Sequence, residues 1–164
     1  MSNTMNDTIR AYVAVAADFG DAIRSETPEG AEAAALAFGE GAHVIDTLGA
    51  PYHPAVQQVV SGELMLVGFG SFNPKRGADA NLLEAAKKKQ PYAMRAFLEV
   101  GANPGVTEKD GATALHWAVG RGCVDCAKVL LAAGGDADAA DAKGVSPRAL
   151  AQKSAKADMV ALFS

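Results

Sequence analysis

The residues that come closest to a reactive site in this sequence of 164 residues are its two cysteines, Cys123 and Cys126. Their C-x-x-C spacing is used by zinc sites and by redox pairs. A structural zinc site needs four ligands, and the sequence has no second cysteine pair. A redox pair normally opens a helix that follows a strand. We therefore expect both cysteines to be structural, with neither zinc nor an internal disulfide of functional importance.

The three histidines do not form a catalytic set. Catalysis by His116 would need a partnered nucleophile or carboxylate, and none recurs near it. His43 and His53 stand alone in the N-terminal half, and Gly68-Phe-Gly70 is too short for a phosphate-binding loop. The prediction is a protein without catalytic residues, metal site or cofactor, and therefore not an enzyme.

Composition narrows the class of protein further. Apolar residues make up 49% and aromatic residues only 6%, with abundant alanine, which favours closely packed helices. The formal net charge of −4 argues against nucleic acid as a partner. No stretch resembles a secretory signal or reaches the ~18 apolar residues of a membrane span. With only two cysteines, the prediction is an intracellular, cytoplasmic protein.

A repeat with an offset of 33 residues organises the C-terminal half. Its apolar positions and glycines recur without a gap, which predicts stacked units of turn, helix, turn and helix. The matching positions include Leu82 with Leu115, Ala85 with Ala118 and Ala151, Phe97 with Leu130 and Phe163, and Gly111 with Gly144. We expect Leu115 and Leu130 to be buried in the middle unit.

The residues between the apolar positions are of types that form turns and cap helices. Gly111 and Gly144 suit tight turns with positive φ. Thr113 and Ser146 can cap the helices that follow them, and Pro147 suits the first helical position. The unit boundaries that follow are 75–107, 108–140 and 141–164.

The segment Thr113-Ala-Leu-His-Trp-Ala118 resembles the T-P-L-H-x-A motif of the ankyrin repeat family. Asn81-Leu-Leu-Glu-Ala-Ala86 resembles an opening repeat, and Ser146-Pro-Arg-Ala-Leu-Ala151 a closing repeat in which Arg148 stands where leucine is usual. The resemblance covers residues 75–164. It implies that His116 bridges neighbouring units through hydrogen bonds. Trp117 stands at a position that is usually apolar and partly buried, which favours a place in the core over a binding hot spot.

The resemblance also implies a function, which is protein–protein recognition by a scaffold, adaptor or regulator. The partner would contact the turn tips and the exposed face of the inner helices. Carried onto this sequence, the partner-binding residues are Lys87, Lys88, Lys109, Asp110, Ala112, Gly120, Arg121, Lys143, Val145, Lys153 and Ser154. The alternative is a fixed structural subunit of a larger assembly.

Residues 1–72 contain no convincing repeat. We expect helices over 8–19, 28–48 and 53–60, with Thr27 capping the second and Pro28 opening it. The N-terminal region would then be a helical extension or cap, and the whole protein all-α, an ankyrin solenoid preceded by helices. Leu64–Gly68 echoes a repeat at the same offset, although Pro51 and Pro54 would then fall in its inner helix.

The glycine-rich segment Gly62–Phe72 allows several interpretations. It suits a strand that bends at Gly68 and Gly70, or an apolar element that packs on the repeats or docks into a partner. It also resembles the L-V-G-F-G-S/T-F turn of the bacterial histone-like HU family, which follows two helices and implies DNA binding. The basic arm of that family is reduced here to Lys75 and Arg76, and the net charge is unfavourable for DNA.

Overall fold

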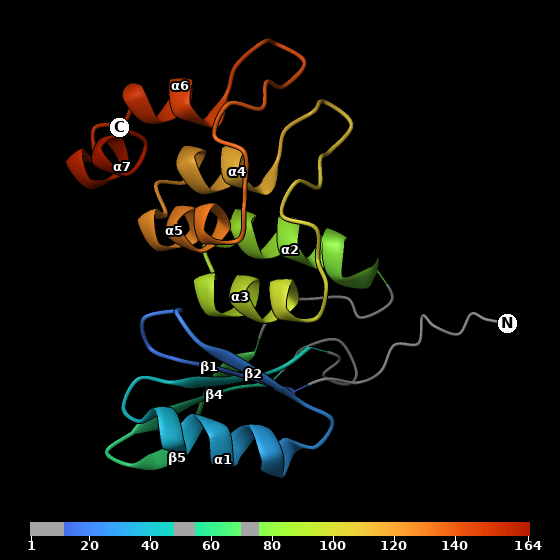
Figure 1. Ribbon diagram of the computed structural model, residues 1–164, viewed down its shortest axis with the longest axis vertical. Helices are drawn as coiled ribbons and strands as arrows, with labels where there is room; N and C mark the ends of the chain where they lie inside the picture. The colour runs from blue at the N-terminus through green and yellow to red at the C-terminus, as the bar shows by residue number, and fades with distance from the viewer. Residues whose placement is uncertain (1–11, 48–54, 70–75) are drawn as a thin grey trace, which may run out of the picture. The chain divides into compact units, whose positions relative to one another are not determined.

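The protein divides into two compact units, residues 1–75 and residues 76–164 (Figure 1). The computed structural model describes residues 12–47, 55–69 and 76–164. Within these ranges no helix is long and apolar enough to cross a membrane.

The described residues of the N-terminal unit form an antiparallel sheet of five strands with one helix. The strands lie side by side in the order β2-β1-β3-β4-β5, and the ladder between β4 and β5 is interrupted by an irregularity between Val56 and Gln57. The elements in chain order are β1 (Tyr12–Val15), β2 (Ala22–Ser25), α1 (Pro28–Phe38), β3 (His43–Asp46), β4 (Ala55–Val60) and β5 (Glu63–Phe69).

Helix α1 packs against the sheet through small side chains. It begins as predicted, since the Thr27 hydroxyl accepts from the Gly30 N–H at 3.2 Å and Pro28 opens the helix. It ends at Phe38 because Gly39 adopts a φ of 92°. The core between the helix and the sheet consists of Ala14, Ala31, Ala35, Ala42, Val44 and Val59.

The predicted all-α class and the mostly helical N-terminal region are wrong. Strands β1 and β4 occupy the predicted helices 8–19 and 53–60, and β3 occupies the end of the predicted helix 28–48. The physical reason lies in the burial of the strands. Val13, Ala14 and Val15 are all buried, although successive residues of a strand point to opposite faces. A strand buried on both faces lacks the alternation of apolar and polar residues that marks a half-exposed strand. Its short apolar run therefore has the same sequence pattern as a segment of a buried helix.

Strand β5 confirms the interpretation of Gly62–Phe72 as a strand as far as Phe69, and residues 70–72 lie outside the described ranges. The HU resemblance required two helices before this segment, whereas the described residues before it form four strands and one helix. The hairpin of β4 and β5 also excludes a degenerate repeat built on Leu64–Gly68, since a repeat needs paired helices there.

The C-terminal unit is a stack of three helix pairs. The first helix of each pair contacts the first helix of the next, and the second helices stack in the same way (Figure 1). We call α2, α4 and α6 the inner helices and α3, α5 and α7 the outer helices. Their bounds are α2 (Gly77–Lys87), α3 (Pro91–Glu99), α4 (Ala114–Gly120), α5 (Val124–Ala132), α6 (Pro147–Gln152) and α7 (Ala157–Leu162).

The core of this unit follows the repeat. Leu115 and Leu130 are 1% and 0% exposed, which confirms the predicted register. Phe97 and Phe163, at positions equivalent to Leu130, are buried as well. Thr113 and Ser146 cap α4 and α6, and Pro147 opens α6, all as predicted.

Candidate partner-binding surface

The second and third repeats each begin with a tight turn, over residues 108–112 and 141–145 respectively. We call these turns the first tip and the second tip. In the first tip the Gly111 N–H donates to the Glu108 carbonyl at 2.9 Å, and the Glu108 N–H donates to the Ala112 carbonyl at 2.9 Å. In the second tip the Gly144 N–H donates to the Asp141 carbonyl and the Asp141 N–H to the Val145 carbonyl, both at 2.9 Å. These equivalent bonds give both tips the same local structure.

The two tips are also bonded to each other. The Ala142 N–H of the second tip donates to the Asp110 carbonyl of the first at 2.8 Å. Gly111 has a φ of +80°, and a Cβ there would lie 3.3 Å from both the Ala142 nitrogen and the Asp141 Cα. Glycine is therefore needed for the turn and for the close approach of the next tip.

His116 holds the second repeat to the third. Its Nδ1 accepts from the Thr113 N–H at 3.0 Å, so Nε2 carries the proton and donates to the Val145 carbonyl at 2.8 Å. The His116 N–H donates to the Thr113 hydroxyl at 3.3 Å and completes a capping box. His116 is 5% exposed. Nδ1 thus fixes the ring within its own repeat, and Nε2 makes the bond to the next repeat that the resemblance implied.

Asp141 fixes the second tip from within. Its Oδ1 accepts from the Val145 N–H at 3.0 Å and from the Lys143 N–H at 2.9 Å. The bond from Val145 lowers the pKa of Asp141 below its ordinary value, and the bond from Lys143 lowers it further. The carboxylate stays ionised near neutral pH and stabilises the turn.

A basic residue follows each inner helix directly. Lys88, Arg121 and Lys153 are the C-caps of α2, α4 and α6, and all three are exposed. A cation at this position is favoured by the partial negative charge of the helix C-terminus. We call these three residues the basic row.

Trp117 lies beside two cations. The Lys87 Nζ is 4.9 Å from the centre of its ring, and the Arg121 Cζ is 5.9 Å away. Lys87 also forms an ion pair with Glu108 of the first tip. The indole Nε1 is buried and has no acceptor within the described part of the chain. The cluster connects the end of α2, the inner face of α4 and the first tip.

The predicted partner-binding residues are not equally accessible. Lys87, Val145 and Ser154 are half-buried. Ala112 is buried, and its N–H donates to the Asp110 carboxylate at 3.0 Å, so it holds the turn. The fully exposed ones are Lys88, Lys109, Asp110, Gly120, Arg121, Lys143 and Lys153. Sequence reasoning favoured the core over a binding hot spot for Trp117, which is half-buried, and Arg121 four residues later lies on the same helix face.

The two cysteines lie inside the second repeat and not at this surface. They are joined by a disulfide across the first turn of α5, a bond that their spacing did not lead us to expect. Cys123 is the N-cap of α5, and its sulfur accepts from the Cys126 N–H at 3.2 Å. Cys123 is 9% and Cys126 0% exposed, so the pair contributes to packing.

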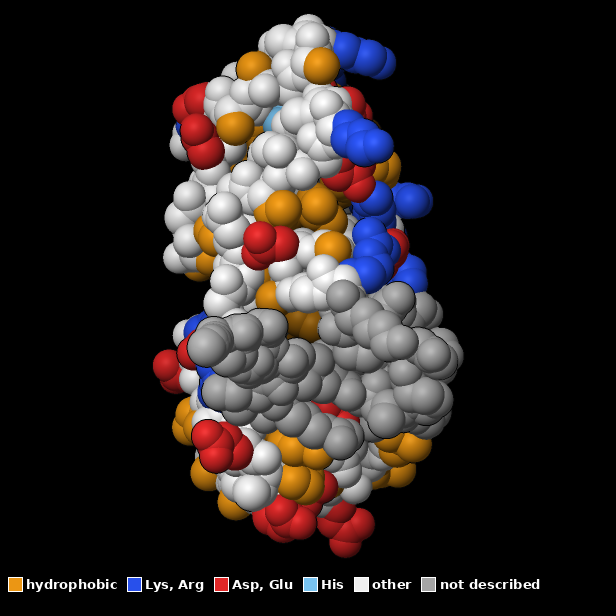
Figure 2. Space-filling model, turned by 90° about the vertical axis from the view of Figure 1, so that its right-hand side faces the viewer, with side chains coloured by type: hydrophobic (Ala, Val, Ile, Leu, Met, Phe, Trp, Pro, Cys, Tyr) orange, Lys and Arg blue, Asp and Glu red, His pale blue; other side chains and the backbone are white. Residues whose placement is uncertain are grey.

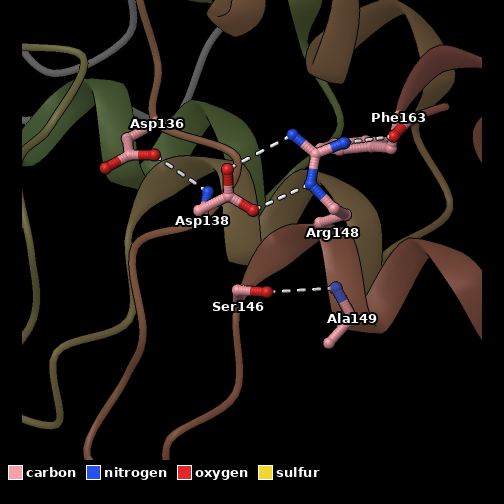
Figure 3. A network of polar contacts seen from close by, with 6 residues as sticks. All are labelled: Asp136, Asp138, Ser146, Arg148, Ala149 and Phe163. Atoms are coloured by element: carbon pink, nitrogen blue, oxygen red, sulfur yellow. Dashed lines mark hydrogen bonds and ion pairs between the residues drawn. The ribbon is translucent and has the colours of Figure 1, made fainter.

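Arg148 closes the last repeat (Figure 3). Its Nε donates to Asp138 at 2.8 Å, and its Nη1 donates to the Phe163 carbonyl at the end of α7. The hydrogen bond from Arg148 lowers the pKa of Asp138, and the Asp136 carboxylate accepts from the Asp138 N–H at 2.9 Å. An arginine at a position where the family has leucine therefore connects the loop before α6 to the C-terminal helix.

The sequence matches the family described as ankyrin repeats (3 copies) over residues 82–163, and the chain belongs to this family. It is 48% identical over 60 residues to the potassium channel AKT3 of Oryza sativa subsp. japonica. It is 35% identical over 79 residues to the potassium channel AKT1 of Oryza sativa subsp. indica. These matches cover 37% and 48% of this chain, but only 7% and 8% of the channels. The ankyrin repeats make the C-terminal unit a protein-interaction module.

Proposed function

We propose that this protein is a non-catalytic scaffold, adaptor or regulator that binds another protein through the tips and the inner-helix ends of its ankyrin repeats. The observation that carries the proposal is the bonding between the tips. Because Ala142 bonds to Asp110 and His116 bonds to Val145, the tip backbone is already fixed before a partner arrives. Side chains on a fixed backbone lose less conformational freedom on binding, which favours affinity.

The charged side chains on this face support the same proposal. Lys109 and Lys143 are exposed on the two tips, and Arg121 is exposed at the end of α4 beside Trp117. Arginine and tryptophan are enriched among the residues that dominate binding energy at protein interfaces. The outer helices carry charges of both signs, such as Asp125 and Lys128 on α5, which serve solubility.

The experiment is capture from a native extract by the tagged full-length protein, followed by mass spectrometry. We expect Lys109→Glu with Arg121→Glu to lose the captured protein while the helical signal in circular dichroism stays unchanged. Arg121→Glu alone should weaken capture, and Lys128→Glu, which makes the same charge reversal on α5, should not. Undiminished capture by the double variant would refute the proposed surface.

A second arm tests the apolar hairpin of the N-terminal unit as a rival docking element. Leu66 on β5 is 58% exposed, which makes it the site for a disruptive change. We expect Leu66→Asp to capture the partner as the wild type does. Loss of capture by Leu66→Asp, with capture retained by the double variant, would assign binding to β5.

A further inference from the structure

The two units carry opposite net charges. Residues 1–75 contain three Lys and Arg against nine Asp and Glu, a net charge of −6. Residues 76–164 contain twelve Lys and Arg against ten Asp and Glu, a net charge of +2. The overall charge of −4 therefore conceals a positive ankyrin unit.

The positive side chains of this unit are not evenly spread. Figure 2 shows Lys and Arg side chains gathered along one edge of the ankyrin unit. The basic row repeats one C-cap position in each of the three helix pairs, and α4 contacts both α2 and α6. Lys109 and Lys143 add exposed cations on the tips of the second and third repeats.

Several carboxylates of this unit have partners within it. Glu108 pairs with Lys87, and Glu84 lies 3.6 Å from Arg76. Asp110 and Asp141 accept backbone N–H groups of their own tips. By contrast, Arg121, Lys153, Lys109 and Lys143 form no ion pair with any residue in the described ranges. Their positive charge is available to a partner.

From this charge distribution we infer that the partner segment bound at this face is acidic, a protein segment whose Asp and Glu side chains meet the basic row and the tip lysines. The inference rests on the proposed function and specifies its partner. Arg121 can bind a carboxylate through two parallel hydrogen bonds, and the Trp117 ring beside it limits the orientations of the guanidinium.

A protein segment fits this surface better than a nucleic acid does. Asp110 and Asp141 stand on the same tips as Lys109 and Lys143, so positive and negative charges alternate there. A phosphate backbone presents charges at fixed close spacing and would meet these carboxylates as well. A peptide can place its carboxylates at the cations alone.

The test is fluorescence anisotropy of the full-length protein with a labelled peptide, (Glu-Glu-Gly)4, and its neutral counterpart, (Gln-Gln-Gly)4. We expect the acidic peptide to bind at least tenfold more tightly at 50 mM NaCl and to weaken at least about tenfold at 300 mM, because exposed ion pairs are screened by salt. Lys88→Gln, Arg121→Gln and Lys153→Gln together should reduce its affinity by about tenfold.

Two control variants separate position from net charge. Lys88→Arg, Arg121→Lys and Lys153→Arg together keep the charge of the row, and this variant should bind within about threefold of the wild type. Lys128→Glu lowers the net charge by two on an outer helix and should bind like the wild type. The inference is overturned if the two peptides bind equally, or if Lys128→Glu weakens binding as much as the triple Gln variant.

Other occupants give distinct results, each of which would overturn the inference. A labelled 12-nucleotide single strand that binds more tightly than the acidic peptide, and is released by the triple Gln variant, would indicate nucleic acid. Salt-sensitive dimers in sedimentation, lost in that variant, would indicate the acidic unit of a second copy. If Lys109→Glu with Arg121→Glu abolishes capture from extract and the triple Gln variant does not, the proposed function stands and the acidic partner falls.

Discussion

The two units differ in the distance along the chain that their contacts span. In the N-terminal sheet β1 pairs with β3, and the helix α1 and strand β2 lie between them in sequence. In the ankyrin unit each helix contacts its own partner and the helices of neighbouring repeats. A surface position of the ankyrin unit therefore recurs in each repeat, as the basic row does. The sheet has no repeated surface position of this kind, and each of its exposed residues has different neighbours.

The largest effect should come from the core of the middle repeat. Leu115→Ala leaves a cavity at a site that is 1% exposed and should cost about 2–5 kcal/mol. Trp117 is the only tryptophan, so its fluorescence during guanidinium unfolding reports on the ankyrin unit. Lys128→Ala, an exposed control, should change stability by less than about 0.5 kcal/mol. A Leu115→Ala midpoint equal to that of the wild type would contradict the repeat register.

A somewhat smaller effect is expected in the sheet. Val59→Ala removes part of a side chain that is 1% exposed in the core beneath α1 and should cost roughly 2 kcal/mol. The Val59 N–H donates to the Ala42 carbonyl at 2.8 Å, and its exchange with solvent should become faster by at least about tenfold. Unchanged exchange would show that this core does not hold β4 to the rest of the sheet.

The disulfide should matter less to the ankyrin unit than Leu115 does. The disulfide joins residues only three apart in sequence. A disulfide that closes a loop of 15 residues stabilises a protein by about 3 kcal/mol, and one that closes a shorter loop stabilises it less. Cys123→Ser with Cys126→Ala should therefore cause a modest loss of stability and leave partner capture unchanged. Stoichiometric zinc in the purified wild type, or loss of capture by the double variant, would assign the cysteines a functional role.

The smallest effect is expected at the C-terminal end. Arg148→Ala removes the bonds to Asp138 and to the Phe163 carbonyl and should speed amide exchange in α7 without a large shift of the unfolding midpoint. The pKa of Asp138 is lower in the folded protein than its unfolded value of 3.8. Its contribution to folding stability is therefore fully present above pH 3.8 and is lost as the pH falls through the folded pKa. If the amide protons of α7 exchange at the same rate in the wild type and in Arg148→Ala, Arg148 does not hold the last repeat closed.

How far the fold could be predicted differs between the units for a physical reason. In the ankyrin unit Leu115, Thr113 and Gly111 each carry a local signal, and the repeat confirms that signal at a second position. In the sheet Val13–Val15 and His43–Asp46 are buried along their whole length, so their pattern does not distinguish strand from helix. Two predictions succeeded there. The start of α1 rests on the local chemistry of Thr27 and Pro28, and β5 confirms the strand in Gly62–Phe72 as far as Phe69.

The candidate partner-binding surface could likewise be predicted only in part from the sequence. The family resemblance, carried onto the repeat register, predicted Arg121 and Lys153 as contact residues of the inner helices, and both stand at the C-caps of such helices. It could not show that Ala112 is buried within its tip or that Lys87 is paired with Glu108, since both depend on side-chain packing. Nor could it show that two cations flank Trp117, because Lys87 comes from the preceding repeat.

Hydrogen–deuterium exchange of the protein with and without its captured partner tests the central claim most directly, because it locates the bound surface without any substitution. We expect the partner to slow exchange in the tips 107–113 and 141–146 and at the ends of α4 and α6, with β5 unchanged. Slower exchange in Glu63–Phe69, with the tips unchanged, would contradict binding by the ankyrin face.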